Sequence, residues 1–275
     1  MKIENLVEHS GEAVTKKRVI RFIYFVAPFM SFLLLFVVWY MASGENVRVF
    51  PTPMHILRRI QLLLYRPLSG ATLFGHIFAS CRRAFIALFF AIVIGIPFGV
   101  LVGWNRAVRA TLGAIFECIR PIPILAWIPL MVMWFGIGEQ AKIIMIFIGA
   151  FMPIVVNSYT GIKMVAPIYL DVGRMFNATT QRQILFRIVF PAALPTIFAG
   201  IRNATSLSLM VVLAAEMLAS RTGLGFLIYR GMEAFDISLV MAGMVCIGLT
   251  GGILALLTNI IERKLCPWNR GLSSE

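Results

Sequence analysis

The chain has 275 residues, of which 60% are hydrophobic and only 13% are charged, and its formal net charge is +13. A soluble domain usually carries about 25% charged residues, so this composition excludes an ordinary water-soluble protein. The basic residues sit between long apolar runs and form no stripe with aromatic residues, which argues against nucleic-acid binding and favours loops that set membrane orientation.

The N-terminal part of the chain predicts a membrane helix that is not removed. A basic segment, residues 1–21, precedes an apolar run at residues 22–42. That run is longer than the roughly 7–15 residues of a signal-peptide core. We therefore expect a cytoplasmic segment followed by a first transmembrane helix.

Residues 43–83 are expected to form a periplasmic loop with an amphipathic helix. Pro53 can open this helix, in which apolar residues repeat opposite arginines: Ile56, Ile60, Leu63 and Leu64 against Arg58, Arg59 and Arg66. The helix either lies on the outer leaflet or packs on the helical bundle. Arg82 and Arg83 adjoin the next apolar run and are expected to reach up to the lipid headgroups.

Five more apolar runs follow, each long enough to cross a bilayer. They cover residues 84–104, 110–135, 143–162, 192–218 and 237–261. The chain is thus predicted to be an all-α membrane protein with about six transmembrane helices, a core domain at 84–262 and a C-terminal tail at 263–275. Six crossings put both termini on one side, and the excess of lysine and arginine there predicts that this side is cytoplasmic.

Small residues recur every fourth position in two of these runs. Gly95, Gly99 and Gly103 do so in the second, and Gly248 and Gly252 do so in the sixth. This spacing lets helix backbones approach closely in lipid, which predicts either tight static packing or an interface that slides.

Charged residues inside the apolar runs are candidates for the translocation path or for gating. Glu117 and Arg120 stand beside Pro121 and Pro123, where broken helical backbone could line a cavity. Arg120 either attracts an anion or pairs with Glu117 three residues away. Arg202 and Glu216, in the fifth run, are the other candidates.

The stretch from Asp171 to Pro195 is amphipathic instead of uniformly apolar. Val172, Met175 and Phe176 form an apolar face at helical spacing, and Asn177 suits a turn. Thr179 or Thr180 can cap a second short helix through Phe186, and Pro191 suits the start of the next span. We expect two short helices in a cytoplasmic loop at residues 163–191.

This loop resembles the cytoplasmic motif of bacterial ABC import permeases. In that motif Glu-Ala-Ala is followed by a glycine four places later and then by Ile-x-Leu-Pro. Asp171, Val172 and Gly173 stand at the first three places, Asn177 at the glycine, and Ile188, Phe190 and Pro191 at the last. The resemblance implies that the residues coupling the loop to an ATPase are Asp171, Val172, Gly173, Met175, Phe176, Asn177, Ala178, Ile188 and Pro191.

Other segments resemble the permeases of taurine, alkanesulfonate and nitrate importers. These segments are FPTP from Phe50, ECIRPIPILAWIPL from Glu117, LAAEMLASRTGLGFLI around Glu216, and RKLCPWN around Trp268. The resemblance implies a type I ABC importer permease fold with cytoplasmic coupling helices.

Such a permease works with partner chains. The resemblance implies a second permease copy as a homodimer, two ATPase subunits that bind ATP and magnesium, a periplasmic solute-binding protein, and the bacterial inner membrane. The chain itself is expected to bind no cofactor and to be no enzyme, because it has no GxxxxGK[ST] loop.

The expected solute is a small anion, taurine or another sulfonate. Nitrate, bicarbonate, an aromatic acid and a vitamin precursor are the alternatives within the family, and a stand-alone secondary carrier is the alternative outside it. A membrane enzyme lacks support, because the sequence shows no nucleophile–base pair. Its three histidines and four cysteines have no metal-site spacing.

Overall fold

The computed structural model of the chain describes residues 23–24, 26–43, 50–175 and 180–267. These residues form helices and, apart from one isolated bridge between Leu68 and Ala71, no β structure, which confirms the all-α prediction. The chain divides into two units, Met1–Arg58 and Arg59–Glu275, which are described in turn.

In the described part of the first unit, the apolar helix Val26–Ala42 corresponds to the first predicted span. Its surface is almost wholly apolar and exposed, as Phe32 (67%) and Leu34 (67%) illustrate, which suits a lipid environment. Trp39 donates a hydrogen bond from its indole nitrogen to the Pro51 carbonyl at 3.3 Å.

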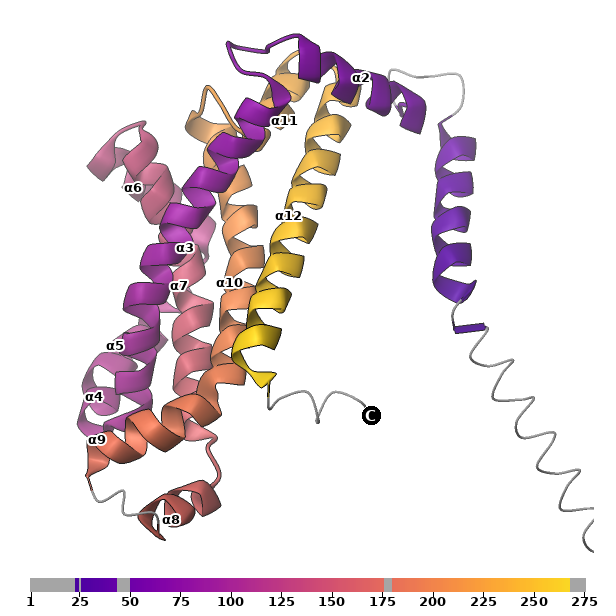
Figure 1. Cartoon of the computed structure of the whole chain (residues 1–275). Coiled ribbons are helices and arrows are strands. Elements are labelled where there is room, and N and C mark those ends of the chain that lie inside the picture. Colours follow the sequence, from indigo (N-terminus) through magenta and orange to yellow (C-terminus); the bar gives the residue numbers. More distant parts are fainter. Residues whose placement is uncertain (1–22, 25, 44–49, 176–179, 268–275) are drawn as a thin grey trace, which may run out of the picture. The chain divides into compact units, whose positions relative to one another are not determined.

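The second unit is a bundle of helices (Figure 1). Its elements are α3 (Leu73–Trp104), α4 (Arg106–Val108), η1 (Arg109–Gly113), α5 (Ala114–Ile119), η2 (Ile124–Trp127), α6 (Ile128–Phe135), α7 (Glu139–Lys163), α8 (Pro167–Met175), α9 (Gln181–Ile184), η3 (Leu185–Val189), α10 (Phe190–Ala219), α11 (Leu224–Glu233) and α12 (Ile237–Leu265). Helix α2 (Pro53–Tyr65) leads into it.

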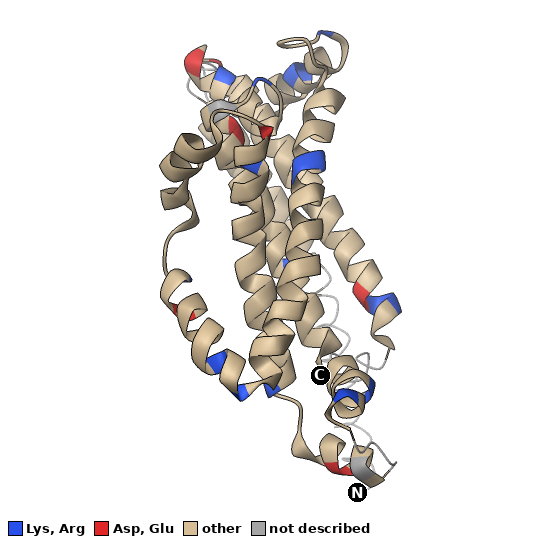
Figure 2. Cartoon of the chain, turned by 90° about the vertical axis from the view of Figure 1, so that its left-hand side faces the viewer, with Lys and Arg blue, Asp and Glu red and all other residues tan. Residues whose placement is uncertain are grey.

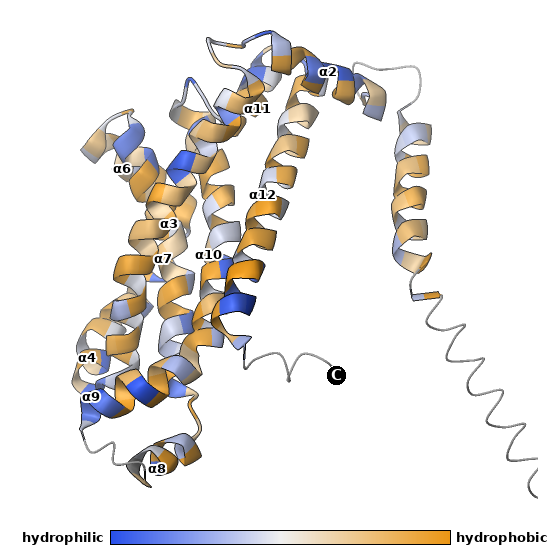
Figure 3. Cartoon of the chain, in the orientation of Figure 1, coloured by the Kyte–Doolittle hydropathy of each residue, from blue (hydrophilic) through white to orange (hydrophobic). Residues whose placement is uncertain are grey.

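Four helices of the described chain are long and apolar enough to cross a membrane. They are Leu73–Trp104, Glu139–Lys163, Gln181–Leu218 and Ile237–Leu265. The predicted third span is different: Arg106–Ile119 and Ile124–Phe135 meet at an angle of 88° and count as one span only as a broken pair. Apolar residues dominate the long helices (Figure 3), and the charged residues gather toward the two ends of the bundle (Figure 2).

The α3–α7 interface is closely packed at the first glycine ladder, as the spacing of its glycines predicts. A Cβ atom on Gly99 would lie 2.6 Å from Ser158 Cβ and 2.7 Å from the Val155 carbonyl oxygen. Gly248 and Gly252 behave differently, because nothing lies within 4 Å of a Cβ at either one. Tight packing at the second ladder is therefore not realised within the described chain.

Helix α3 begins at Leu73, well before the expected start of the second span at residue 84. The predicted periplasmic loop, residues 43–83, is correspondingly shorter, because its last part extends this helix. In the second unit α2 packs on the bundle: Leu63 is only 2% exposed, and Arg59 pairs with Asp236 at 2.6 Å, at the start of α12. This contact supports the packed interpretation of the amphipathic helix.

Candidate functional site

Two short helices, α8 and α9, lie at one end of the bundle, as predicted for the loop (Figure 1). Thr180 is the N-cap of α9, and the Gln183 side chain accepts a hydrogen bond from the Thr180 N–H at 3.3 Å, which forms a capping box. Phe176, Asn177 and Ala178 of the expected coupling residues lie outside the described residues.

Helix α8 presents part of its apolar face to solvent. Val172 is 44% exposed and Met175 is 85% exposed. Gly173 is buried on the other side, where an added Cβ would overlap the end of the Ile188 side chain in η3. One side of α8 therefore packs on the bundle, and the other leaves apolar side chains available to a partner.

The second short helix does not stop at Phe186 but continues into the fifth span. The Phe190 N–H bonds to the Leu185 carbonyl, a π-helical bond that widens one turn in η3. A proline in a regular helix would clash with the carbonyl four residues before it, and the wider turn relieves this clash at Pro191. The span expected at residues 192–218 thus begins at Gln181 and joins the loop to α10 as one helix.

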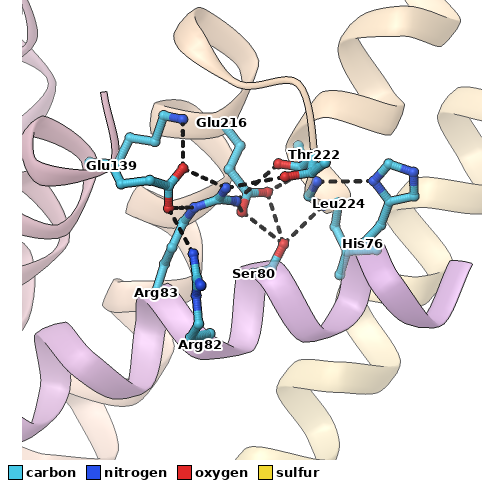
Figure 4. Close-up of polar contacts among 11 residues, drawn as sticks. His76, Ser80, Arg82, Arg83, Glu139, Glu216, Thr222 and Leu224 are labelled. Atoms are coloured by element: carbon cyan, nitrogen blue, oxygen red, sulfur yellow. Dashed lines mark hydrogen bonds and ion pairs between the residues drawn. The ribbon is translucent and has the colours of Figure 1, made fainter. Parts of the chain in front are cut away.

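The other end of the bundle holds a buried carboxylate, Glu216 on α10, which is fully shielded from solvent (Figure 4). It accepts hydrogen bonds from Arg83 Nη1 at 2.6 Å, from Ser80 Oγ at 2.9 Å and from the Gly225 N–H at 2.9 Å. A buried charge is expensive unless it is paired and hydrogen-bonded, and both conditions are met here.

Arg83 is the hub of this network. It is 2% exposed, and it clamps Glu139 at the start of α7 through two bonds of 2.8 Å from Nε and Nη2. Nη1 also donates to the Thr222 carbonyl at 2.9 Å. The prediction that Arg83 reaches up to lipid headgroups is wrong, because its carboxylate partners come from distant helices. Arg82 is 53% exposed and lies 3.3 Å from Glu139.

His76 extends the network to the loop before α3. The Gly223 N–H donates to His76 Nδ1 at 3.0 Å, so the ring hydrogen sits on Nε2, which is 3.2 Å from the Leu68 carbonyl. Gly223 has φ +128°, and an added Cβ there would overlap the Glu216 carboxylate. The network therefore joins α3, α7, α10 and the loop before α11.

The broken third span brings Glu117 and Arg120 together as the predicted ion pair, at 3.4 Å. Both side chains are well exposed within the chain, at 61% and 48%. Pro121 and Pro123 lie in the break between α5 and η2, where the chain turns. Arg120 therefore pairs with Glu117, as one of the two interpretations of the sequence predicts. It does not contact the network around Arg83.

Arg202 pairs with Glu262, which ties the middle of α10 to the last turns of α12. The sequence predicts a role for Arg202 but not for Glu262. An acidic residue near the end of an apolar span resembles the charged residues that commonly end a membrane helix. Within the described residues no group of three or more His, Cys, Asp or Glu side chains could hold a metal ion.

Comparisons with known proteins agree with this architecture. The family described as "Binding-protein-dependent transport system inner membrane component" matches residues 95–271. The taurine transport system permease protein TauC of Escherichia coli is 34% identical over 86% of this chain and 87% of its own length. The nitrate import permease protein NrtB of Synechocystis is 34% identical over 92% and 94%, respectively.

The similarity extends to a relative named for sulfonates and to a solved structure. The putative aliphatic sulfonates transport permease protein SsuC of Bacillus subtilis is 30% identical over 96% of this chain and 95% of its own. A structure of the MetNI methionine ABC transporter in an inward-facing conformation matches with a TM-score of 0.62 and 22% identity, over 70% of this chain and 95% of that one. At that identity the match shows the fold alone, and it confirms the predicted type I importer permease fold.

Proposed function

Because the chain belongs to the family of binding-protein-dependent transport system inner membrane components, the permeases of ABC importers, we propose that it carries a small anion, taurine or another sulfonate, across the inner membrane. A periplasmic binding protein delivers the solute. Two partner ATPase subunits, which bind ATP and magnesium, supply the energy. The permease acts as a homodimer with both termini in the cytoplasm.

One observation carries the coupling part of this proposal: α8 exposes Val172 and Met175, and the next helix, α9, continues through η3 into α10. An apolar surface at a water-facing end favours burial against a protein partner. Movement of a partner docked on α8 would reach η3 through the contact of Gly173 with Ile188, and η3 continues into α10 as one helix. This arrangement supports a role as the ATPase contact.

The solute class is supported by the names of the relatives, which include taurine, nitrate and aliphatic sulfonates. All three are anions or carry an anionic group. Arg120 and Arg202, each in an apolar span, are the residues we propose to meet the anion on its path. Each has an acidic partner in this chain, so an anion would have to compete with Glu117 or Glu262.

The coupling test replaces Met175 with glutamate in the full chain, coexpressed with its ATPase and reconstituted with its binding protein. We expect ATPase binding to weaken at least about tenfold, because an unpaired carboxylate would be buried at the contact. ATP-driven uptake should fall accordingly, while the permease still elutes as a folded membrane protein.

Met232→Glu is the matched control, since Met232 is also exposed (53%) but lies on α11, at the opposite end of the bundle (Figure 1), and it should leave ATPase binding unchanged. Uptake that survives Met175→Glu unchanged would remove α8 as the contact. Uptake by the permease without any ATPase would instead support a secondary carrier and overturn the importer mechanism.

The solute test is separate and measures the affinity of the partner binding protein for taurine, alkanesulfonates and nitrate. Preference for a sulfonate supports the proposal. Preference for nitrate, bicarbonate, an aromatic acid or a vitamin precursor would be consistent with an importer but would contradict a sulfonate as its solute. A strictly neutral or cationic ligand would contradict the anion argument.

A further inference from the structure

A cavity of about 210 Å³ lies among α3, η1, α5 and α7. Figure 1 shows α5 toward the end of the bundle that carries α8 and α9. Its wall is mainly apolar, with Val102, Phe116, Val155 and Val156 contributing side chains. The volume is below the roughly 300–1,000 Å³ of pockets that enclose a drug-sized ligand. It therefore suits part of a larger apolar molecule.

Two cations share one aromatic ring at this cavity. Arg109 and Tyr159 line it, and the Arg109 guanidinium carbon lies 5.7 Å from the centre of the Tyr159 ring. Lys163 Nζ lies 5.5 Å from the same ring centre and 3.1 Å from the Tyr159 hydroxyl. Cation–π contacts of this kind hold the charged groups in place without neutralising them.

The charge at this position is not balanced by a carboxylate. Arg109 donates to the backbone carbonyls of Val102 and Gly103 at the end of α3. In the part of the chain that the structure describes, neither Arg109 nor Lys163 forms an ion pair. Glu117 also lines the cavity, but its carboxylate pairs with Arg120.

We propose that this cavity binds an anionic phospholipid, with a segment of acyl chain inside and the phosphate at Lys163 and Arg109. Lys163 is the last residue of the apolar helix α7, which places its ammonium group at the level of the membrane interface, where lipid phosphates lie. A small hydrophilic solute would find few hydrogen-bond partners, because only Arg109, Glu117 and Tyr159 of the lining carry polar side chains. The inference uses the membrane location and does not depend on which solute is transported.

The test is native mass spectrometry of the full-length permease released from detergent, titrated with phosphatidylglycerol or with phosphatidylcholine of the same acyl chains. We expect the wild type to retain phosphatidylglycerol in preference. Lys163→Gln should weaken phosphatidylglycerol binding about fivefold and leave phosphatidylcholine unchanged, as expected from one basic residue near an anionic headgroup. Lys163 is exposed, so this change should not disturb folding.

Two further variants separate the cavity from general surface charge. Arg230→Gln removes one charge from α11 at the opposite end and should not alter lipid binding. Ala114→Leu fills the cavity and should weaken both lipids. The proposal would be overturned by equal retention of the two lipids by the wild type, by equal losses in Lys163→Gln and Arg230→Gln, or by displacement of phosphatidylglycerol with added taurine.

Discussion

The buried network around Arg83 predicts that replacing Arg83 destabilises the protein more than replacing its ion-pair partner Glu216. Glu216 has Arg83 as its cationic partner, whereas Arg83 also holds Glu139 through two bonds of 2.8 Å. Arg83→Met therefore strands a carboxylate that is fully shielded from solvent. Glu216→Gln leaves the arginine paired and can keep the bond from the Gly225 N–H.

The magnitudes follow from this asymmetry. Removing one partner of a buried ion pair costs about 3–5 kcal/mol, which we assign to Arg83→Met. Replacing one charged hydrogen-bond acceptor costs about 1.5–3 kcal/mol, which we assign to Glu216→Gln. The double variant has no stranded carboxylate at position 216, so it should be more stable than Arg83→Met alone. Glu139 adds little, because its side chain is 43% exposed and keeps Lys142 at 3.1 Å.

The assay is the thermal midpoint of the purified full chain in detergent, followed by size-exclusion chromatography after heating. At about 2–4 °C per kcal/mol, Arg83→Met should lower the midpoint by about 6–20 °C. Arg82→Met is the matched control, because Arg82 is 53% exposed and an exposed ion pair contributes about 1 kcal/mol or less. The prediction would be refuted if Glu216→Gln lowered the thermal midpoint as much as Arg83→Met or more. It would also be refuted if the decrease in the double variant equalled the sum of the two single decreases.

Three further predictions concern other parts of the bundle. Gly99→Val should prevent α3 and α7 from packing, because its Cβ alone would lie 2.7 Å from the Val155 carbonyl oxygen. Gly252→Val is the control, because the space around Gly252 is open. Equal expression of folded protein by the two variants would contradict the prediction. Thr180→Ala should cost about 1 kcal/mol through loss of the N-cap of α9 and make the loop easier to cleave by protease, whereas Thr180→Ser should not. Burial, and then the nearby Glu262 carboxylate, raises the pKa of the Cys266 thiol. Alkylation of Cys266 should therefore be slower than that of free cysteine and should accelerate only at a higher pH. An alkylation rate equal to that of free cysteine would contradict this prediction.

Local pattern was enough to predict much of the fold. Apolar runs located the spans because lipid demands long apolar helices, and glycine spacing marked Gly99 as a point of close helix packing without indicating that α7 is the partner. The π-helical turn before Pro191 was not predicted, because regular helix periodicity carries no sign of one wider turn. It joins two segments that the sequence suggests are separate.

Only part of the buried network around Arg83 could be predicted from the sequence. Glu216 stood out as an acid in an apolar run, but Arg83 resembled an ordinary residue at the edge of a span. Their hydrogen bond joins positions 133 residues apart, and no local pattern encodes such a pairing. The same holds for Glu262, whose importance depends on Arg202 in another helix.

The order of these charges along the chain has a consequence for how the protein is built in the membrane. Arg83 is synthesised first, Glu139 joins it with α7, and Glu216 arrives last with α10. At no stage does a carboxylate of the network precede its arginine. Each acid therefore enters the membrane after its cationic partner, and the pairing of Glu216 with Arg83 joins α10 to α3 and, through Glu139, to α7.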